Sequence, residues 1–151
     1  MGDYREHALD GASAVDLVVA LYDGMIRFLY AAMEAAERGD AERRLAEVKR
    51  ALDIIIHLQA RLRMDVGGRP AQALSEFYAA TFAQILQASQ SASRTKFEHA
   101  IDCVRNVRDA WRQVARDAGE NMDGPAAAAP VHPVTGRHAE TAAQPRTIWT
   151  V

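Results

Sequence analysis

Histidine, cysteine and carboxylate side chains are the groups in this chain that could bind a metal ion or carry out catalysis. A di-iron site in a helical bundle needs carboxylates together with Glu-x-x-His repeats that converge on the core. The sequence has no Glu-x-x-His repeat, and His57 and His99 fall on polar faces of the predicted helices. The residues around His57 also lack the Lys-Gly pair of phosphotransfer histidines. We therefore predict solvated histidines, no metal site and no cofactor.

A single cysteine and a glycine pair are the remaining candidates for chemistry. Cys103 lies at the edge of an apolar helical stripe, where we see no residue that would activate the thiol. Gly67-Gly68 is followed by Arg69-Pro70, which does not match a phosphate-binding loop and predicts a break between helices. Serine, histidine and aspartate form no recognisable setting for a nucleophile. We therefore predict no catalytic residues, and a protein that is not an enzyme.

Composition and charge limit the class of protein further. The chain has 151 residues, of which 49% are hydrophobic and 25% charged, with a net charge of −2. This near-neutral charge provides no attraction to nucleic acid, and no apolar run reaches the roughly 20 residues of a membrane span. One cysteine fits a reducing compartment, and Asp3, Glu6 and Asp10 argue against a signal peptide. We expect one cytoplasmic domain that binds neither nucleic acid nor a membrane.

Helical periodicity predicts the elements that position these residues. Apolar residues recur at helical spacing in four segments, at about 13–38, 41–64, 70–89 and 96–118. Short connections between the segments favour an all-α fold, an antiparallel up-down four-helix bundle over residues 13–118. Residues 1–12 are expected to form a flexible N-terminal segment, and residues 119–151, rich in alanine and proline, a disordered tail.

Capping residues predict where the helices begin and end. Ser13 and Asp16 have the spacing of a capping box at the start of the first helix. Gly39 suits the left-handed position after that helix, and Asp40 suits the N-cap of the next. Pro70 suits the first position of the third helix.

The first helix carries more apolar surface than a bundle helix needs. Between Leu17 and Met33 the polar side chains fall within an arc of about 80°, whereas an apolar face of about three residues in seven suffices. The third helix is poorly charged too, since Glu76 is the only charged residue from 71 to 93. A protein usually covers such surfaces with another segment of chain, its own or a partner's.

Three aromatic residues bear on where a covered surface would lie. Trp111 sits in the middle of the fourth apolar stripe, which predicts a core position. Tyr22 and Tyr78 fit a core edge and a binding interface equally well, because tyrosine has an apolar ring and a polar hydroxyl.

A group of short motifs lies in a fixed order along the chain. The central motif is Leu21-Tyr22-Asp23-Gly24, followed by Ile26-Arg27-Phe28-Leu29. The accompanying segments are Tyr4, Leu9, Ala12-Ser13, Asp16-Leu17, Arg63-Met64-Asp65-Val66-Gly67-Gly68, Ala73-Leu74, Leu86-Gln87-Ala88 and Asp109-Ala110-Trp111-Arg112-Gln113. In type and spacing they resemble the flagellin-specific export chaperone family, FliS, over residues 4 to about 116.

The chain departs from the family's pattern at a few positions. Ala14 stands where proline is usual, and Ser89 stands where asparagine is common. Phe77-Tyr78-Ala79-Ala80 replaces the usual Leu-Tyr-Asp-Tyr. The departures on and beside the third helix alter the surface that this helix presents.

The resemblance implies a fold, a function and partners. Family members are antiparallel four-helix bundles in the cytoplasm that bind the disordered C-terminal segment of flagellin, prevent its premature polymerisation and support its delivery to the flagellar type III export apparatus. A component of the export gate and other flagellar regulators are further partners to consider. Holding and release follow from competing binding equilibria, without ATP or a metal.

The resemblance also implies a binding groove and a segment that covers it. The residues expected to line a flagellin groove are Leu17, Val18, Leu21, Tyr22, Met25, Leu29, Tyr78 and Phe82. By analogy, Tyr4 and Leu9 are expected to shield this groove in the free protein, which we expect to be a monomer or weak homodimer.

Two other classes of protein stay open from the residues alone. A self-associating helical-bundle adaptor or regulatory protein would use the apolar surface for oligomerisation and would ignore flagellin. A small bundle enzyme or metalloprotein is opposed by the missing ligand spacings. The tail adds a further alternative, because Ile148-Trp149-Thr150-Val151 is either a disordered end or a short docking element.

Overall fold

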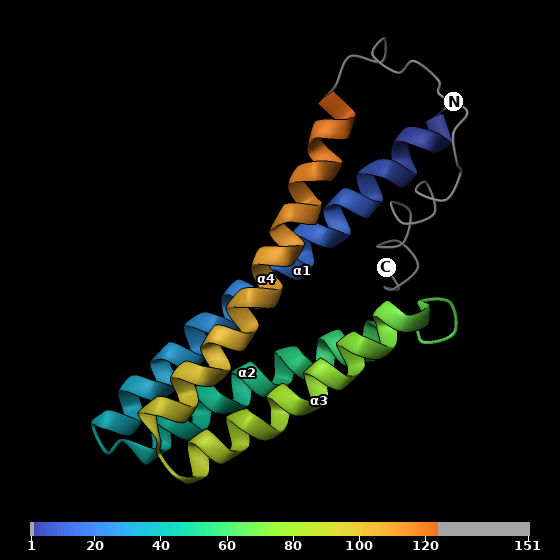
Figure 1. Cartoon of the computed structure of the whole chain (residues 1–151). Helices are drawn as coiled ribbons and strands as arrows, with labels where there is room; N and C mark the ends of the chain where they lie inside the picture. The colour runs from blue at the N-terminus through green and yellow to red at the C-terminus, as the bar shows by residue number, and fades with distance from the viewer. Residues whose placement is uncertain (1, 124–151) are drawn as a thin grey trace.

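Four long helices make up the computed structural model of this chain, which describes the backbone of residues 2–123 and the side chains of residues 14–121. The helices are α1 (Gly2–Glu37), α2 (Ala41–Arg61), α3 (Gly68–Gln90) and α4 (Arg94–Asp123). Each helix runs antiparallel to the next, and α1 packs on α2 and α4 while α3 packs on the same two helices (Figure 1). The predicted all-α four-helix bundle is confirmed for the described residues.

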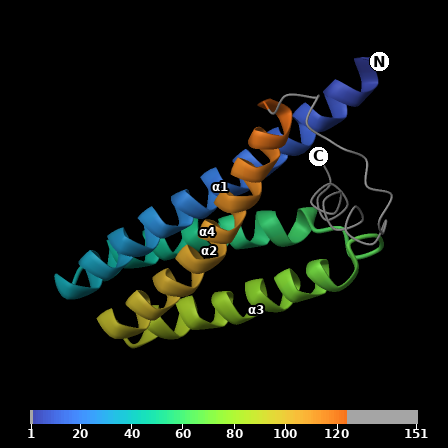
Figure 2. The same cartoon turned by 45° about the horizontal axis from the view of Figure 1, so that its top comes forward.

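The bundle has a four-helix end and a two-helix end. The N-terminal part of α1 and the C-terminal part of α4 run side by side beyond the shorter α2–α3 pair, which diverges from them (Figures 1 and 2). The tight turns between α1 and α2 and between α3 and α4 lie at the four-helix end. The α2–α3 connection and the end of α4 therefore lie toward the opposite end.

The predicted start of the first helix at Ser13 is wrong, because α1 begins at Gly2. Residues 2–12 include alanine and leucine and no proline, and adding residues to an existing helix is much easier than nucleating one. The segment therefore continues α1 by about three turns. The side chains of Tyr4 and Leu9 lie outside the described residues, as does the chain from 124 to 151.

The other boundaries shift by a few residues. Helix α2 ends at Arg61 rather than near residue 64, and α4 continues through Gly119 to Asp123 instead of ending near residue 118. Pro70 is the third residue of α3 rather than the first. A proline is still tolerated there, because the first-turn N–H groups have no partner within the helix.

The turn between α1 and α2 forms as predicted. Gly39 has a φ of +71°, and the Asp40 N–H donates to the Ala35 carbonyl at 2.9 Å, as in a Schellman motif. The Asp40 side chain accepts a hydrogen bond from the Arg43 N–H at 3.0 Å, which confirms its N-cap role. The α3–α4 turn repeats this geometry with Ala92, at a φ of +47°, in place of glycine.

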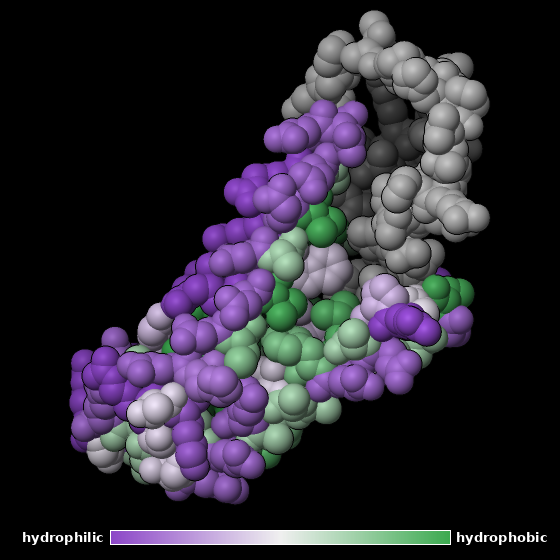
Figure 3. Space-filling model, viewed as in Figure 1, coloured by the Kyte–Doolittle hydropathy of each residue, from purple (hydrophilic) through white to green (hydrophobic). Residues whose placement is uncertain are grey.

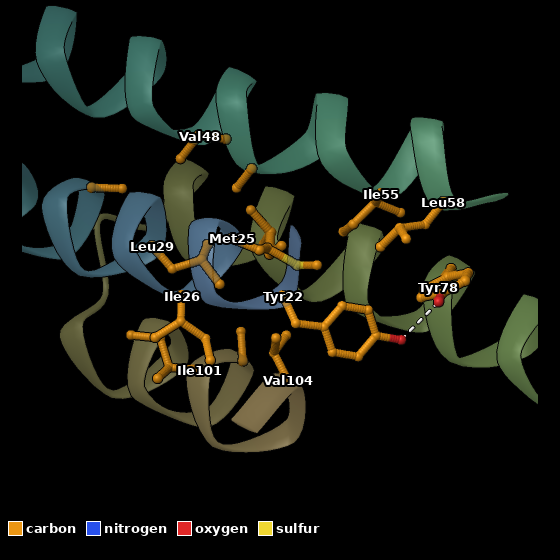
Figure 4. Packing of buried hydrophobic residues seen from close by; sticks show 14 of the residues in the cluster. Tyr22, Met25, Ile26, Leu29, Val48, Ile55, Leu58, Tyr78, Ile101 and Val104 are labelled. Atoms are coloured by element: carbon orange, nitrogen blue, oxygen red, sulfur yellow. Dashed lines mark hydrogen bonds between the residues drawn. The ribbon is translucent and has the colours of Figure 1, made fainter. Parts of the chain in front are cut away.

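The core draws side chains from all four helices, and it covers much of the apolar surface of α1. Because α1 packs between α2 and α4, its own chain covers two sides of it. Trp111 of α4 is 8% exposed, which confirms its predicted core position. The labelled core residues in Figure 4 are Tyr22, Met25, Ile26, Leu29, Val48, Ile55, Leu58, Tyr78, Ile101 and Val104.

Candidate docking groove

Most of the residues predicted to line a flagellin groove lie in the core of this structure. Val18, Tyr22, Met25, Leu29 and Tyr78 are each at most 4% exposed. They stabilise the bundle and offer little surface to a partner. The remaining three, Leu17, Leu21 and Phe82, are accessible, and Leu17 is 49% exposed. Leu17 and Leu21 lie on α1, whereas Phe82 lies on α3, beside a groove.

An apolar groove of about 430 Å³ lies between α2 and α3. We call it the α2–α3 groove; its lining residues are Ile55, Ile56, Gln59, Ala60, Ser75, Tyr78, Ala79 and Phe82. None of these side chains is charged. Gln59 and Ser75 are hydrogen-bonded to each other, since Gln59 Nε2 donates to Ser75 Oγ at 2.9 Å, and the Tyr78 hydroxyl is bonded to that of Tyr22. The structure thus brings together Tyr78 and Phe82 of the predicted set, with new residues from α2.

Sequence reasoning missed the α2 side of this groove. Ile56 belongs to the apolar face of α2 that its periodicity predicts to be covered, but it is 56% exposed. The signal was present, because Leu45, Leu52 and Ile56 form a row at spacings of seven and four residues, beside the core row that contains Ile55. The apolar arc of α2 is therefore wider than its packing needs.

The same rows extend the apolar surface beyond the groove itself. Leu45 on α2 is 56% exposed and Leu86 on α3 is 37% exposed, and helical spacing sets them on the same faces as the groove residues Ile56 and Phe82. From Leu45 to Ala60 the strip is about 22 Å long, at 1.5 Å per residue. This length matches about four turns of a docked helix.

Apolar side chains also gather on the other flank of α3. In Figure 3 they occupy the hollow between α4 and the α2–α3 pair. The partly buried residues of these helices that pack on the core include Leu74, Phe77, Val107 and Val114. Helix α3, which the sequence marked as poorly charged, is thus flanked by apolar surface on both sides.

A buried tyrosine pair joins the floor of the groove to α1. The hydroxyls of Tyr22 and Tyr78 lie 2.7 Å apart, and the rings meet edge to face at 6.4 Å between centroids (Figure 4). Burial raises the pKa of Tyr22 to about 12, although hydrogen bonds from Tyr78 and Trp111 oppose this. Burial also raises the pKa of Tyr78, as does the adjacent Tyr22. Both tyrosines are buried here, at 0% and 1% exposed, and Tyr78 also lines the floor of the groove.

Ion pairs connect α1 to α4 along the contact between them, which we call the α1–α4 seam. Asp23 of α1 accepts from Arg108 at 3.1 Å and from Arg112 at 3.3 Å. At the far end of the same seam, Arg94 of α4 pairs with Glu37 at 2.6 Å. These ion pairs link the two long helices, whereas no residue that lines the α2–α3 groove is charged.

The histidines and the cysteine take the places expected from the sequence, with one addition. His57 and His99 are exposed and Cys103 is half-buried. His99 lies one turn before Cys103, and its Nε2 is 3.8 Å from the thiol sulfur, a neighbour that the sequence analysis missed. Among residues 14–121, no group of three or more His, Cys, Asp or Glu side chains is arranged to hold a metal ion.

Within the described part of the chain, no helix has the length and apolar character needed to span a membrane.

Comparison with known proteins shows the family of the chain. The model of the family described as "Flagellar protein FliS" matches residues 1–118. A flagellar secretion chaperone FliS of Vibrio cholerae is 31% identical over 106 residues, covering 70% of this chain and 78% of the relative. The Salmonella typhimurium and Bacillus subtilis proteins of the same name are 31% and 23% identical over 114 and 121 residues, covering 75% and 80% of this chain and 84% and 90% of the relatives. The chain therefore belongs to the FliS family of flagellar proteins.

Proposed function

We propose that this protein is a flagellar secretion chaperone that holds the C-terminal segment of flagellin, with the α2–α3 groove as a principal contact. The observation that carries the proposal is an open apolar groove, without a charged lining residue, on a member of the FliS family. The relatives are named flagellar secretion chaperones, which supports a protein client rather than a small substrate.

The geometry of the groove favours a helical client segment. An amphipathic helix that docks into an apolar groove presents residues at spacings of three, four and seven, and a strip of about 22 Å accommodates about four turns. The exposed side chains of Leu45, Ile56 and Leu86 would meet such residues without rearrangement of the core. Ordering a client segment costs about 2–5 kcal/mol, which allows a tight complex that can still release its client.

Held in this way, the client would be unable to polymerise in the cytoplasm before export. Delivery to the flagellar type III export apparatus would then bring the chaperone to a component of the export gate. Tyr4 and Leu9 remain predicted groove-covering residues. Their segment continues α1 alongside α4 (Figure 2), so covering the α2–α3 groove would require this helix to bend.

Calorimetric titration with the C-terminal segment of flagellin from the same genome tests the proposal. We expect a 1:1 complex with a negative heat-capacity change. Ile56→Glu should weaken binding at least about tenfold, which corresponds to about 1.4 kcal/mol, because it places a charge in the groove. His57→Glu is the matched control, since His57 is the exposed neighbour outside the groove, and it should bind like the wild type.

Two results would contradict the proposal. One is the absence of flagellin binding by a folded wild-type protein. The other is equal affinity of the Ile56→Glu and His57→Glu variants. A stable oligomer of the wild type that ignores flagellin would favour the self-associating adaptor instead, with a second copy of the chain in the groove.

A further inference from the structure

The chain continues well beyond the residues that match its family. The family model ends at residue 118 and α4 ends at Asp123. Residues 124–151, which we call the tail, contain four prolines and mostly small or polar residues until Ile148-Trp149-Thr150-Val151. Trp149 is the one aromatic residue of Phe, Tyr or Trp type in the tail. The tail thus ends in a short motif whose composition differs from everything before it.

The α2–α3 groove has the chemistry that such a motif needs. Its lining is apolar apart from Gln59 and Ser75, which bond to each other. Aromatic and branched side chains gain most from leaving water, so a Trp and an Ile side chain suit this lining. Ile56 leaves more than half of its own surface available to cover.

The position of the groove places it within reach of the tail. The Gln59–Ser75 bond lies near the α2–α3 connection, which is toward the same end of the bundle as the end of α4 (Figure 1). From Asp123 to Ile148 the chain has 25 further residues, which can span up to about 80 Å. This span exceeds the length of α3, about 35 Å for its 23 residues.

We infer that residues 148–151 dock into the α2–α3 groove of their own chain and compete there with an incoming client. A tethered motif acts at a high effective concentration, so even a weak contact can occupy the groove for part of the time. The inference uses the same groove as the proposed function, but it does not require that flagellin be the client.

Disulfide trapping in the full-length protein tests the docking directly. In a Cys103→Ser background, Ala79→Cys in the groove is combined with Thr150→Cys, and the free protein is treated with oxidised glutathione. The control pairs Thr150→Cys with Asn106→Cys, an exposed position on α4 that is nearer to the tail along the chain. We expect the groove pair to cross-link within one chain at least about fivefold faster, because docking raises its effective concentration.

The outcomes separate the inference from its alternatives. Equal rates for the two pairs would show that the motif has no preferred site and would overturn the inference. Cross-links that form mainly between chains, at a rate that rises with protein concentration, would assign the groove to a second copy and would overturn it too.

Client affinity provides a second measurement with its own control. Trp149→Ala together with Ile148→Ala should raise the affinity for the flagellin segment about threefold to tenfold, since an internal competitor is removed. Val134→Ala, a substitution elsewhere in the tail, should leave it unchanged. If flagellin does not bind but the groove pair cross-links, the proposed function fails while the inference stands. If flagellin binds and the groove pair does not cross-link, the proposed function stands while the inference fails.

Discussion

The α1–α4 seam and the α2–α3 groove differ in the kind of side chain that they expose. Along the seam, Asp23 pairs with Arg108 and Arg112, and the rim is polar. Along the groove, Ile56 and Leu45 are each 56% exposed although both are fully apolar. The seam has charged pairs at its rim, whereas the groove keeps apolar side chains accessible, as is expected of a surface that binds a partner.

Stability measurements on one residue from each region provide the largest contrast. Leu29→Ala should lower the free energy of unfolding by about 2–5 kcal/mol, because Leu29 is fully buried and its truncation leaves a cavity. Ile56→Ala should change it by less than about 0.5 kcal/mol, as at most surface positions. Urea unfolding followed by circular dichroism measures both. Similar losses for the two variants would mean that the groove is part of the core.

The tyrosine pair sharpens the comparison, because it joins the floor of the groove to the central helix. Tyr22→Phe should cost about 1–3 kcal/mol, since it removes a hydrogen-bond partner of both the Tyr78 hydroxyl and Trp111. Tyr78→Phe should cost less, about 1 kcal/mol, because Tyr22 would keep its hydrogen bond with Trp111. Urea unfolding checks this order, and the reverse order would contradict the arrangement.

The same pair predicts a loss of stability at alkaline pH. The pKa of Tyr22 is raised in the folded protein from about 10 to about 12, so the folded state retains a proton that the unfolded state releases. The stabilisation is fully present below about pH 10 and is lost as the pH rises toward 12. Urea unfolding at several alkaline pH values should show that the free energy of unfolding falls less steeply with pH in Tyr22→Phe than in the wild type.

The seam itself should show a smaller effect that depends on salt. Asp23→Asn should lower the free energy of unfolding by about 1 kcal/mol, because the Asp23 carboxylate is partly buried between two arginines. Adding salt should reduce this difference. Asp53→Asn is the control, since Asp53 is 57% exposed and its ion pair is with Lys49 of the same helix. Equal losses for the two variants would argue against a role of the seam in stability.

The smallest effect concerns the two turns at the four-helix end. Ala92→Gly should stabilise the protein by about 0.5 kcal/mol, because Ala92 has a positive φ that glycine adopts without strain. Gly39→Ala should destabilise it by about 1 kcal/mol for the same backbone reason. No atom lies within 4 Å of the added Cβ, so a steric clash does not add to this cost. Thermal unfolding measures both, and a loss of stability in Ala92→Gly would contradict this account.

Local sequence signals determined the helices and one of the turns between them. Gly39 and Asp40 specified the end of α1 and the start of α2 because their conformational preferences act within a few residues. The motifs around Tyr22 indicated the family that the match over residues 1–118 shows. The helix start predicted from the capping box at Ser13 was wrong for the same local reason. The motif takes no account of the preceding residues, which extend the helix toward the N-terminus.

The tertiary structure alone decided which apolar residues are buried and which are available to a partner. Periodicity placed Val18 and Leu17 on α1, and Ile55 and Ile56 on α2, but it could not say which neighbouring helix would cover each of them. In the folded chain Val18 is 4% exposed and Leu17 49%, and Ile55 is 3% exposed and Ile56 56%. A sequence specifies the angle of a side chain about its own helix, whereas burial depends on how closely the other helices approach that angle.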